Sequence, residues 1–222
     1  MLPRAIVFDL DGTLIDSAPD LADALNGVLR SQGLREHALD DVKAMVGAGA
    51  KVLIQRGFAA NGKALSEREA DHLLPAFLAD YRARATDKTH LMPGAQRLLT
   101  QLAAAGVRLG LCTNKPEDIT RQILEDLAVA SLFGSIVGGD TTPAKKPDPH
   151  PLLYTLEELG CAADEALMVG DSAADAGAAK AAGTGLALVT FGYSQVPVAE
   201  LGPGILIEHF DDFLPALDTS AP

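Results

Sequence analysis

Residues 5–13 read AIVFDLDGT, a run of four apolar residues followed at once by two aspartates two positions apart. An apolar run without polar interruption is typical of a parallel strand that is covered on both faces. If the strand geometry continues, Asp9 and Asp11 project to one side and Leu10 projects to the other. Two carboxylates so close together repel each other and are costly to bury, so we expect a cation between them. This stretch therefore predicts a buried strand that ends at a charged site.

Further apolar runs follow along the chain, separated by segments with helical spacing. The runs are VRLGLC (107–112), SIVG (135–138), ALMVG (166–170), GLALV (185–189) and the weaker ILI (205–207). The helical segments between and before them are 93–106, 116–129, 148–160 and 172–183. This alternation of strands and helices predicts an α/β fold with a Rossmann-like, doubly wound parallel sheet.

The alternation is interrupted between residues 16 and 88, where helical patterns occur without a convincing strand. Apolar residues from Leu21 to Leu29 lie along one helical face, and residues 66–85 have the same character. We therefore expect an all-helical domain, residues 16–88, inserted into a catalytic core made of residues 1–15 and 89–222.

Composition limits the classes of partner. The 222 residues carry a formal charge of −12, which argues against nucleic acid or an anionic membrane as partner. A small anionic substrate remains compatible with this charge. Charges farther away than ~8 Å are largely screened by salt, so the cations close to the site determine whether an anion binds. No apolar run reaches the ~18 residues expected of a membrane span.

The expected location is the cytoplasm. The first apolar run is broken by Asp9 and has no small-residue cleavage site, so it does not resemble a signal peptide. Cys112 and Cys161 show no CxxC pairing, which fits a reducing compartment. The oligomeric state, monomer or dimer, is left open.

Polar residues follow each strong strand. They are Asp9 and Asp11, then Thr113, Asn114 and Lys115, then Lys145 and Lys146, and finally Asp171 and Asp175. Because ligands bind beyond the carboxyl ends of parallel strands, these side chains are expected to converge. Several carboxylates suit Mg²⁺, and the cation and a lysine would together bind an anion such as phosphate. One aspartate could then attack phosphorus and a second could transfer protons.

Each segment alone has a simpler interpretation. DLDGT (9–13) fits an Asx turn, KKPDP (145–149) fits a solvated loop, and GDSAAD (170–175) fits a capped helix start. The simpler interpretations lose weight because all of these segments fall at strand ends.

Four motifs in order make the chain resemble the haloacid dehalogenase-like phosphatase superfamily. They are FDLDGTLIDS (8–17), TN (113–114), KKPDP (145–149) and VGDSAAD (169–175). The resemblance implies an Mg²⁺-dependent enzyme in which Asp9 is the nucleophile and Asp11 is the general acid and base. It further implies that the inserted helices form a cap that opens and closes over the site.

The resemblance also assigns the binding residues. Thr113, Asn114 and Lys146 are the expected phosphate-binding residues. The expected metal ligands are Asp9, the Asp11 backbone carbonyl and Asp171, with Asp175 acting through water.

Two features discriminate within the superfamily. Dehalogenase relatives have another residue in place of Asp11, so its presence favours a phosphatase or a phosphomutase. The stretch VGAGAKVLIQRG (46–57) resembles the substrate loop of phosphoglycolate phosphatases, with Gly47, Gly49 and an inward Lys51 as the candidate reader. A simple connecting turn with a surface Lys51 is the alternative.

The implied function is hydrolysis of a small phosphomonoester, 2-phosphoglycolate, through an aspartyl phosphate. Two enzymatic alternatives remain, a sugar phosphomutase resembling β-phosphoglucomutase and a phosphatase of a sugar phosphate or pyrophosphate. A non-catalytic phosphoprotein-binding module is the alternative from a different class.

Overall fold

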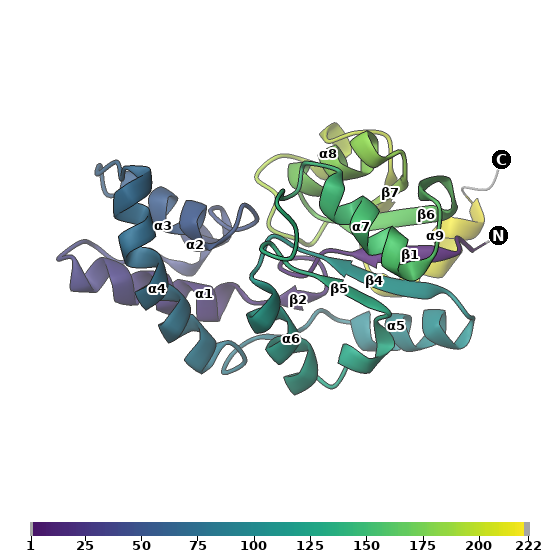
Figure 1. Ribbon diagram of the computed structural model, residues 1–222, viewed down its shortest axis with the longest axis horizontal. Helices are drawn as coiled ribbons and strands as arrows, with labels where there is room; N and C mark the ends of the chain where they lie inside the picture. The colour runs from purple at the N-terminus through teal and green to yellow at the C-terminus, as the bar shows by residue number, and fades with distance from the viewer. Residues whose placement is uncertain (1, 220–222) are drawn as a thin grey trace.

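The computed structural model describes residues 2–219 and is built on a six-stranded parallel sheet with helices on both faces (Figure 1). Its strands are β1 (Ala5–Phe8), β4 (Arg108–Cys112), β5 (Ser135–Val137), β6 (Ala166–Gly170), β7 (Gly185–Val189) and β8 (Ile205–Ile207). Their order across the sheet is β5-β4-β1-β6-β7-β8, and every neighbouring pair is parallel. The predicted α/β, Rossmann-like doubly wound sheet is therefore confirmed.

Alternate side chains of β1 face the two helical layers. Ile6 and Phe8 pack in the larger core cluster with residues of α5, α6 and α9, whereas Ala5 and Val7 pack with residues of α7 and α8. These helices are α5 (Ala95–Ala104), α6 (Glu117–Asp126), α7 (His150–Leu159), α8 (Ala173–Ala182) and α9 (Phe213–Thr219). Short 3₁₀ turns are η1 (Ala130–Leu132), η2 (Ala163–Glu165), η3 (Val198–Glu200) and η4 (Phe210–Asp212). Because helices cover both faces of the sheet, all four residues of β1 are buried, which explains its uninterrupted apolar sequence.

The helices α1 to α4 lie at one end of the molecule, beside the sheet (Figure 1). They are α1 (Ala18–Ser31), α2 (Leu39–Lys43), α3 (Ala50–Ala59) and α4 (Glu67–Arg84), and together they are called the helical unit below. A capping box starts α4, in which Ser66 and Glu69 exchange side-chain and backbone hydrogen bonds. The exact domain limits, 1–15 with 89–222 and 16–88, remain a prediction.

The two chain crossings between the sheet and the helical unit are paired. The short strands β2 (Ile15–Asp16) and β3 (His90–Leu91) form an antiparallel ladder that the sequence did not suggest. Next to them, the buried Asp20 carboxylate accepts hydrogen bonds from the backbone N–H groups of Lys88 and Thr89. The entry and exit of the helical unit are thus fixed to each other.

In the described part of the chain, none of the helices is both long enough and apolar enough to pass through a bilayer. Cys112 is buried, and both it and Cys161 are free thiols.

Candidate active site

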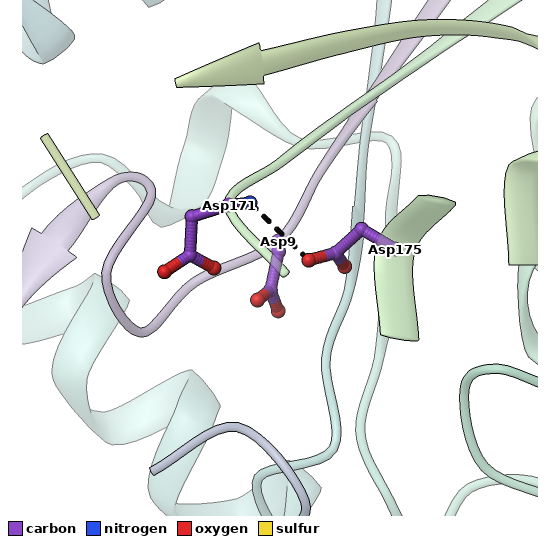
Figure 2. Close-up of side chains that lie close together, drawn as sticks. All are labelled: Asp9, Asp171 and Asp175. Atoms are coloured by element: carbon purple, nitrogen blue, oxygen red, sulfur yellow. Dashed lines mark hydrogen bonds between the residues drawn. The ribbon is translucent and has the colours of Figure 1, made fainter. Parts of the chain in front are cut away.

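Three buried carboxylates meet where the strand order of the sheet reverses. Asp9 follows β1 and Asp171 follows β6, and these two strands are hydrogen-bonded neighbours. Asp175 lies in the first turn of α8. One oxygen from each carboxylate lies within 4.8 Å of the others (Figure 2). The convergence expected from the strand ends is found for these three residues.

Burial makes this cluster electrostatically costly. It raises the pKa of Asp9 to about 6, although the Lys146 ammonium opposes the shift. Burial, and then the neighbouring Asp175 charge, also raise the pKa of Asp171 well above its usual value. A divalent cation would offset this repulsion, and carboxylate oxygens are the ligands that hard cations prefer. The donor set therefore fits a divalent metal ion. The Asp11 carboxylate is not part of the cluster, and the expected contact through its backbone carbonyl stays a prediction.

Lys146 reaches the cluster from the loop after β5. Its Nζ lies 2.8 Å from Asp9 Oδ1 and 2.6 Å from Asp175 Oδ1, and its side chain is only 2% exposed. A buried ammonium needs such partners, because desolvation alone would favour loss of its proton. The two carboxylates outweigh burial and raise the pKa of Lys146, so the side chain remains positively charged beside Asp9.

Asp175 also organises the start of α8. Its second oxygen, Oδ2, accepts hydrogen bonds from the backbone N–H groups of Asp171 and Ser172 and from the Ser172 hydroxyl. Figure 2 shows the bond from the Asp171 N–H. Because the same carboxylate pairs with Lys146, it fixes the positions of both Lys146 and Asp171.

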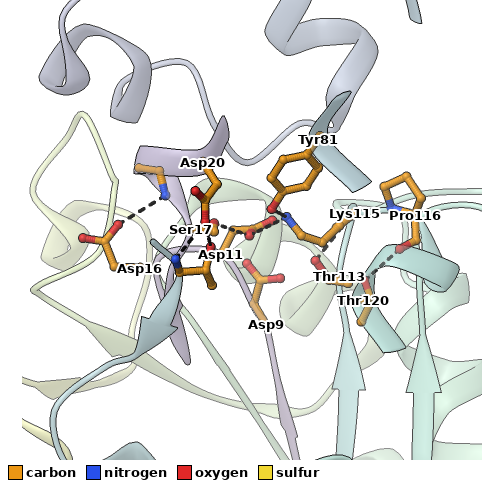
Figure 3. Close-up of polar contacts among 12 residues, drawn as sticks. Asp9, Asp11, Asp16, Ser17, Asp20, Tyr81, Thr113, Lys115, Pro116 and Thr120 are labelled. Carbon is orange, nitrogen blue, oxygen red and sulfur yellow. Dashed lines mark hydrogen bonds and ion pairs between the residues drawn. The ribbon is translucent and has the colours of Figure 1, made fainter. Parts of the chain in front are cut away.

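Asp11 lies in a second chain of polar contacts (Figure 3). Its Oδ1 atom is 2.8 Å from Lys115 Nζ and also accepts a hydrogen bond from the Ser17 hydroxyl. Lys115 Nζ in turn donates to the hydroxyl of Tyr81, which belongs to α4, at 2.7 Å. The candidate acid is therefore held between the sheet, through Lys115, and the entry to the helical unit, through Ser17.

Thr113 and Asn114 follow β4, and both are buried in the wall of the pocket that contains Asp9 and Asp11. The Asn114 side-chain amide donates to the carbonyl oxygens of Gly47 and Lys146, both at 3.1 Å. The Asn114 side chain thus links the loop that contains Lys146 to the loop that contains Gly47.

The loop before α3 forms part of the same pocket. Gly47 and Gly49 line it, and both have positive φ values, 109° and 89°, that favour glycine. A Cβ atom on Gly49 would lie 3.3 Å from the Asn114 carbonyl oxygen, so the loop approaches the sheet closely.

Of the two orientations that the sequence leaves open for Lys51, the structure shows the one that points away from the pocket. Its Nζ forms ion pairs with Glu67, at 2.5 Å, and with Asp71, at 2.9 Å, both on α4. Lys51 lies in the first turn of α3, and the phase of that helix directs its side chain to α4 rather than into the pocket. The sequence-based assignment of Lys51 to the substrate loop is therefore corrected.

The sequence matches a known family over most of its length. The family model described as haloacid dehalogenase-like hydrolase matches residues 6–189. The chain belongs to the haloacid dehalogenase-like hydrolases.

Other haloacid dehalogenase-like hydrolases are similar over nearly the whole chain. The chain is 47% identical to a phosphoglycolate phosphatase of Rhodospirillum rubrum, in a match that covers 96% of this chain and 88% of the relative. It is 41% identical to a phosphoglycolate phosphatase of Caulobacter vibrioides, covering 93% and 87%. A solved structure described as a predicted phosphoglycolate phosphatase from Haemophilus somnus has a TM-score of 0.90 and 33% identity, covering 96% of this chain and 97% of the other. The predicted class, a phosphoric monoester hydrolase, is confirmed by these similarities.

Haloacid dehalogenase-like phosphatases generally use a divalent metal ion, and the cluster of Asp9, Asp171 and Asp175 supplies suitable ligands for one.

Tyr193 supports the cluster of Asp9, Asp171 and Asp175, and its role is not predicted from the sequence. Its backbone N–H donates to Asp171 Oδ2 at 2.6 Å, and its hydroxyl accepts hydrogen bonds from the backbone N–H groups of Ser17 and Ala18. It lies after β7 and outside the four family motifs, so no sequence pattern points to it.

Lys115 and Tyr81 were not assigned a role either. The sequence did place Lys115 beside Thr113 and Asn114 at a strand end, which is a signal for a site residue. Tyr81 comes from α4, and only the fold brings it to the pocket.

Proposed function

We propose that this haloacid dehalogenase-like hydrolase is a phosphoglycolate phosphatase, which converts 2-phosphoglycolate and water into glycolate and phosphate. The observation that carries the proposal is that Asp9 and Asp11 line one pocket, with a buried Lys146 ammonium 2.8 Å from Asp9. The phosphoglycolate phosphatases at 40–47% identity support the choice of substrate.

In the first step a carboxylate oxygen of Asp9 attacks phosphorus, and the bond from phosphorus to the ester oxygen breaks. The proton of a neutral Asp11 carboxyl passes to the departing oxygen, so glycolate leaves without a second negative charge on that oxygen. An aspartyl phosphate on Asp9 remains, together with an ionised Asp11.

In the second step Asp11 accepts a proton from water, and the water oxygen attacks phosphorus. The bond between phosphorus and the Asp9 oxygen breaks, which releases phosphate and restores both carboxyl groups. Lys115 and Ser17, which contact Asp11 Oδ1, would keep the ionised carboxylate in place between the two steps.

We propose Mg²⁺ as the metal ion, held by Asp9, Asp171 and the Asp11 backbone carbonyl, with Asp175 acting through water. When bound, Mg²⁺ would neutralise charge on the phosphoryl oxygens. Lys146 would share that task, because its charge lies beside Asp9 in a site with little water.

Thr113 and Asn114 are proposed to hold the phosphoryl group with Lys146. Both side-chain N–H bonds of Asn114 are already used, on Gly47 and Lys146, so its contribution would come from its backbone N–H. The Thr113 hydroxyl accepts a 3.3 Å hydrogen bond from the Lys115 backbone N–H and still has its own hydrogen to donate.

The proposed substrate is a small anion, and the proposed location of the protein is the cytoplasm.

The test is a comparison of kcat/KM, with Mg²⁺, for 2-phosphoglycolate, hexose phosphates, glycerol phosphates and pyrophosphate. We expect 2-phosphoglycolate to have the highest value, and Asp9→Asn serves as the background control. A hexose phosphate with a clearly higher value would remove the substrate assignment and leave the phosphatase class. Isomerisation of β-glucose 1-phosphate without net release of phosphate would favour the phosphomutase.

A further inference from the structure

The pocket contains a single positive charge. Of the described residues 2–219, those that line the pocket include one cationic side chain, Lys115. Lys146 is paired with Asp9 and Asp175 and is not among the lining residues, and Lys51 is paired with residues of α4 outside the pocket. Lys145 is not among the lining residues, although its Nζ would lie 3.4 Å from a Cβ atom on Gly49. Among the lining residues, Lys115 is therefore the charged partner for an anionic part of a ligand other than its phosphoryl group.

The surroundings of Lys115 make its charge effective. Its side chain is 3% exposed, and the helical unit contributes an apolar wall of Leu21, Leu53, Phe77 and Leu78 to the same pocket. The Asp11 carboxylate at 2.8 Å and the Tyr81 hydroxyl at 2.7 Å offset the cost of burying the Lys115 ammonium. Because water is largely excluded, an ion pair here is stronger than one at the surface.

Two hydrogen-bond donors remain free beside each other. An ammonium group has three N–H bonds, and Lys115 uses one for Asp11 and one for Tyr81. Among the groups whose contacts the structure describes, no acceptor is found for the third, nor for the hydrogen of the Tyr81 hydroxyl, which accepts from Lys115. The nitrogen and oxygen atoms that carry these hydrogens are 2.7 Å apart, so they could serve the two oxygens of one carboxylate.

The position of Lys115 fits the chemistry of the proposed substrate. In 2-phosphoglycolate one methylene group separates the ester oxygen from the carboxylate carbon. The group that protonates the ester oxygen must therefore lie close to the group that binds the carboxylate. Lys115 Nζ meets this requirement, because it is 2.8 Å from Asp11 Oδ1.

We propose that Lys115, assisted by the Tyr81 hydroxyl, binds the carboxylate of the leaving group and selects for it (Figure 3). This inference rests on the proposed function and assigns the recognition of the carboxylate to the loop after β4. Lys115 lies in the loop after β4 and Tyr81 lies in α4, so the carboxylate would also bridge this loop and the helical unit.

The experiment compares 2-phosphoglycolate with 2-hydroxyethyl phosphate, which has the same chain length and no carboxylate. The measured quantity is the ratio of their kcat/KM values. In Lys115→Met the ratio should fall by about tenfold or more, the usual worth of a charge-assisted hydrogen bond. Damage transmitted through Asp11 affects both esters equally and cancels from the ratio. In the control Lys51→Met, which removes a lysine outside the pocket, the ratio should not change.

A second variant and a binding measurement keep the test independent of folding. Tyr81→Phe retains the ring, and it should lower the ratio by about tenfold, because the lost hydrogen bond is one to a charged carboxylate. In Lys115→Met the inhibition constant of glycolate should rise by about the same factor by which the kcat/KM ratio falls. The inhibition constant of phosphate should change less. Melting curves establish that each variant is folded, and if Lys115→Met is not, Tyr81→Phe decides.

The possible failures can be told apart. If the wild-type enzyme prefers 2-phosphoglycolate and Lys115→Met retains that preference, the inference is overturned and the proposed function stands. If the wild-type enzyme shows no preference for 2-phosphoglycolate, the proposed function fails and the inference fails with it.

Discussion

Tyr193 and Asp171 are joined by a 2.6 Å hydrogen bond from the backbone N–H of the tyrosine to Oδ2 of the aspartate. The hydroxyl of the same tyrosine donates to Asp16 Oδ1 at 2.6 Å and accepts from the backbone N–H groups of Ser17 and Ala18. One residue therefore contacts both the carboxylate cluster and the entry to the helical unit. The position of α1 and the geometry of the carboxylate cluster are consequently linked.

Tyr193→Phe should loosen the start of α1 while leaving the bond to Asp171 in place. The change removes the Tyr193 acceptor from the Ser17 N–H and leaves the Ala18 N–H with only a 3.3 Å hydrogen bond to Asp16 Oδ1. We expect a loss of about 1–3 kcal/mol in the free energy of unfolding. Hydrogen exchange at Ser17 and Ala18 should accelerate. Tyr154→Phe, on α7, is the control. Unchanged exchange at both amides would show that the hydroxyl does not hold this turn.

Asp9→Asn should abolish turnover and leave the fold intact. The amide has nearly the same shape as the carboxylate, but it is a poor nucleophile and a weaker metal ligand. The measurements are phosphate release and circular dichroism. Activity near that of the wild-type enzyme in a folded preparation would remove Asp9 as the nucleophile.

Asp11→Asn should reduce turnover by ~10²–10⁴-fold, the usual contribution of a general acid and base. The reduction should be larger for an alkyl phosphate than for p-nitrophenyl phosphate, because p-nitrophenolate leaves without needing a proton. Rates for the two esters are compared in the variant and in the wild-type enzyme. Equal damage to both would argue against Asp11 as the acid.

Removal of metal by EDTA should stop activity, and added Mg²⁺ should restore it. Asp171→Ala should raise the Mg²⁺ concentration needed for half-maximal activity, because one anionic ligand is lost. Asp164→Ala, a change outside the metal cluster, is a matched control. Full activity of the wild-type enzyme in metal-free buffer would contradict the site.

Metal affinity should depend on pH between about 5 and 7. The pKa of Asp9 is raised to about 6 and that of Asp171 is also raised, so protons compete with the cation as the pH falls through 6. Where one proton is displaced, the apparent affinity should fall about tenfold for each unit below that pKa. Calorimetric titration of the substrate-free protein with Mg²⁺ at pH 5.5 and 7.5 measures this. Equal affinity at the two values would show that the cluster binds no extra proton.

The sheet was predictable because its strands are short, continuous apolar runs. The predicted strands 5–8, 166–170, 185–189 and 205–207 match β1, β6, β7 and β8 at both ends. The meeting of Asp9 and Asp171 followed from parallel topology alone, since adjacent strand ends share one edge of the sheet.

The remaining features depend on tertiary packing. The strands β2 and β3 have two residues each, which is too short for a periodic pattern. The direction of Lys51 depends on the phase of α3 relative to α4, and the sequence does not encode that phase locally. Tyr193 reaches Asp16 and Asp171 from a distant loop, so only the folded chain reveals its contacts.

The ladder between β2 and β3 has a consequence for the architecture as a whole. Ile15 pairs with Leu91 and Asp16 pairs with His90, so in topological terms all of α1–α4 is the loop of a single β-hairpin. Closing a flexible loop costs only about 0.6 kcal/mol more for each doubling of its length. The stability of the sheet should therefore depend little on the length of the segment inserted between β2 and β3. A circular permutant or a graft that keeps these two pairs should preserve the sheet while exchanging α1–α4 for another module.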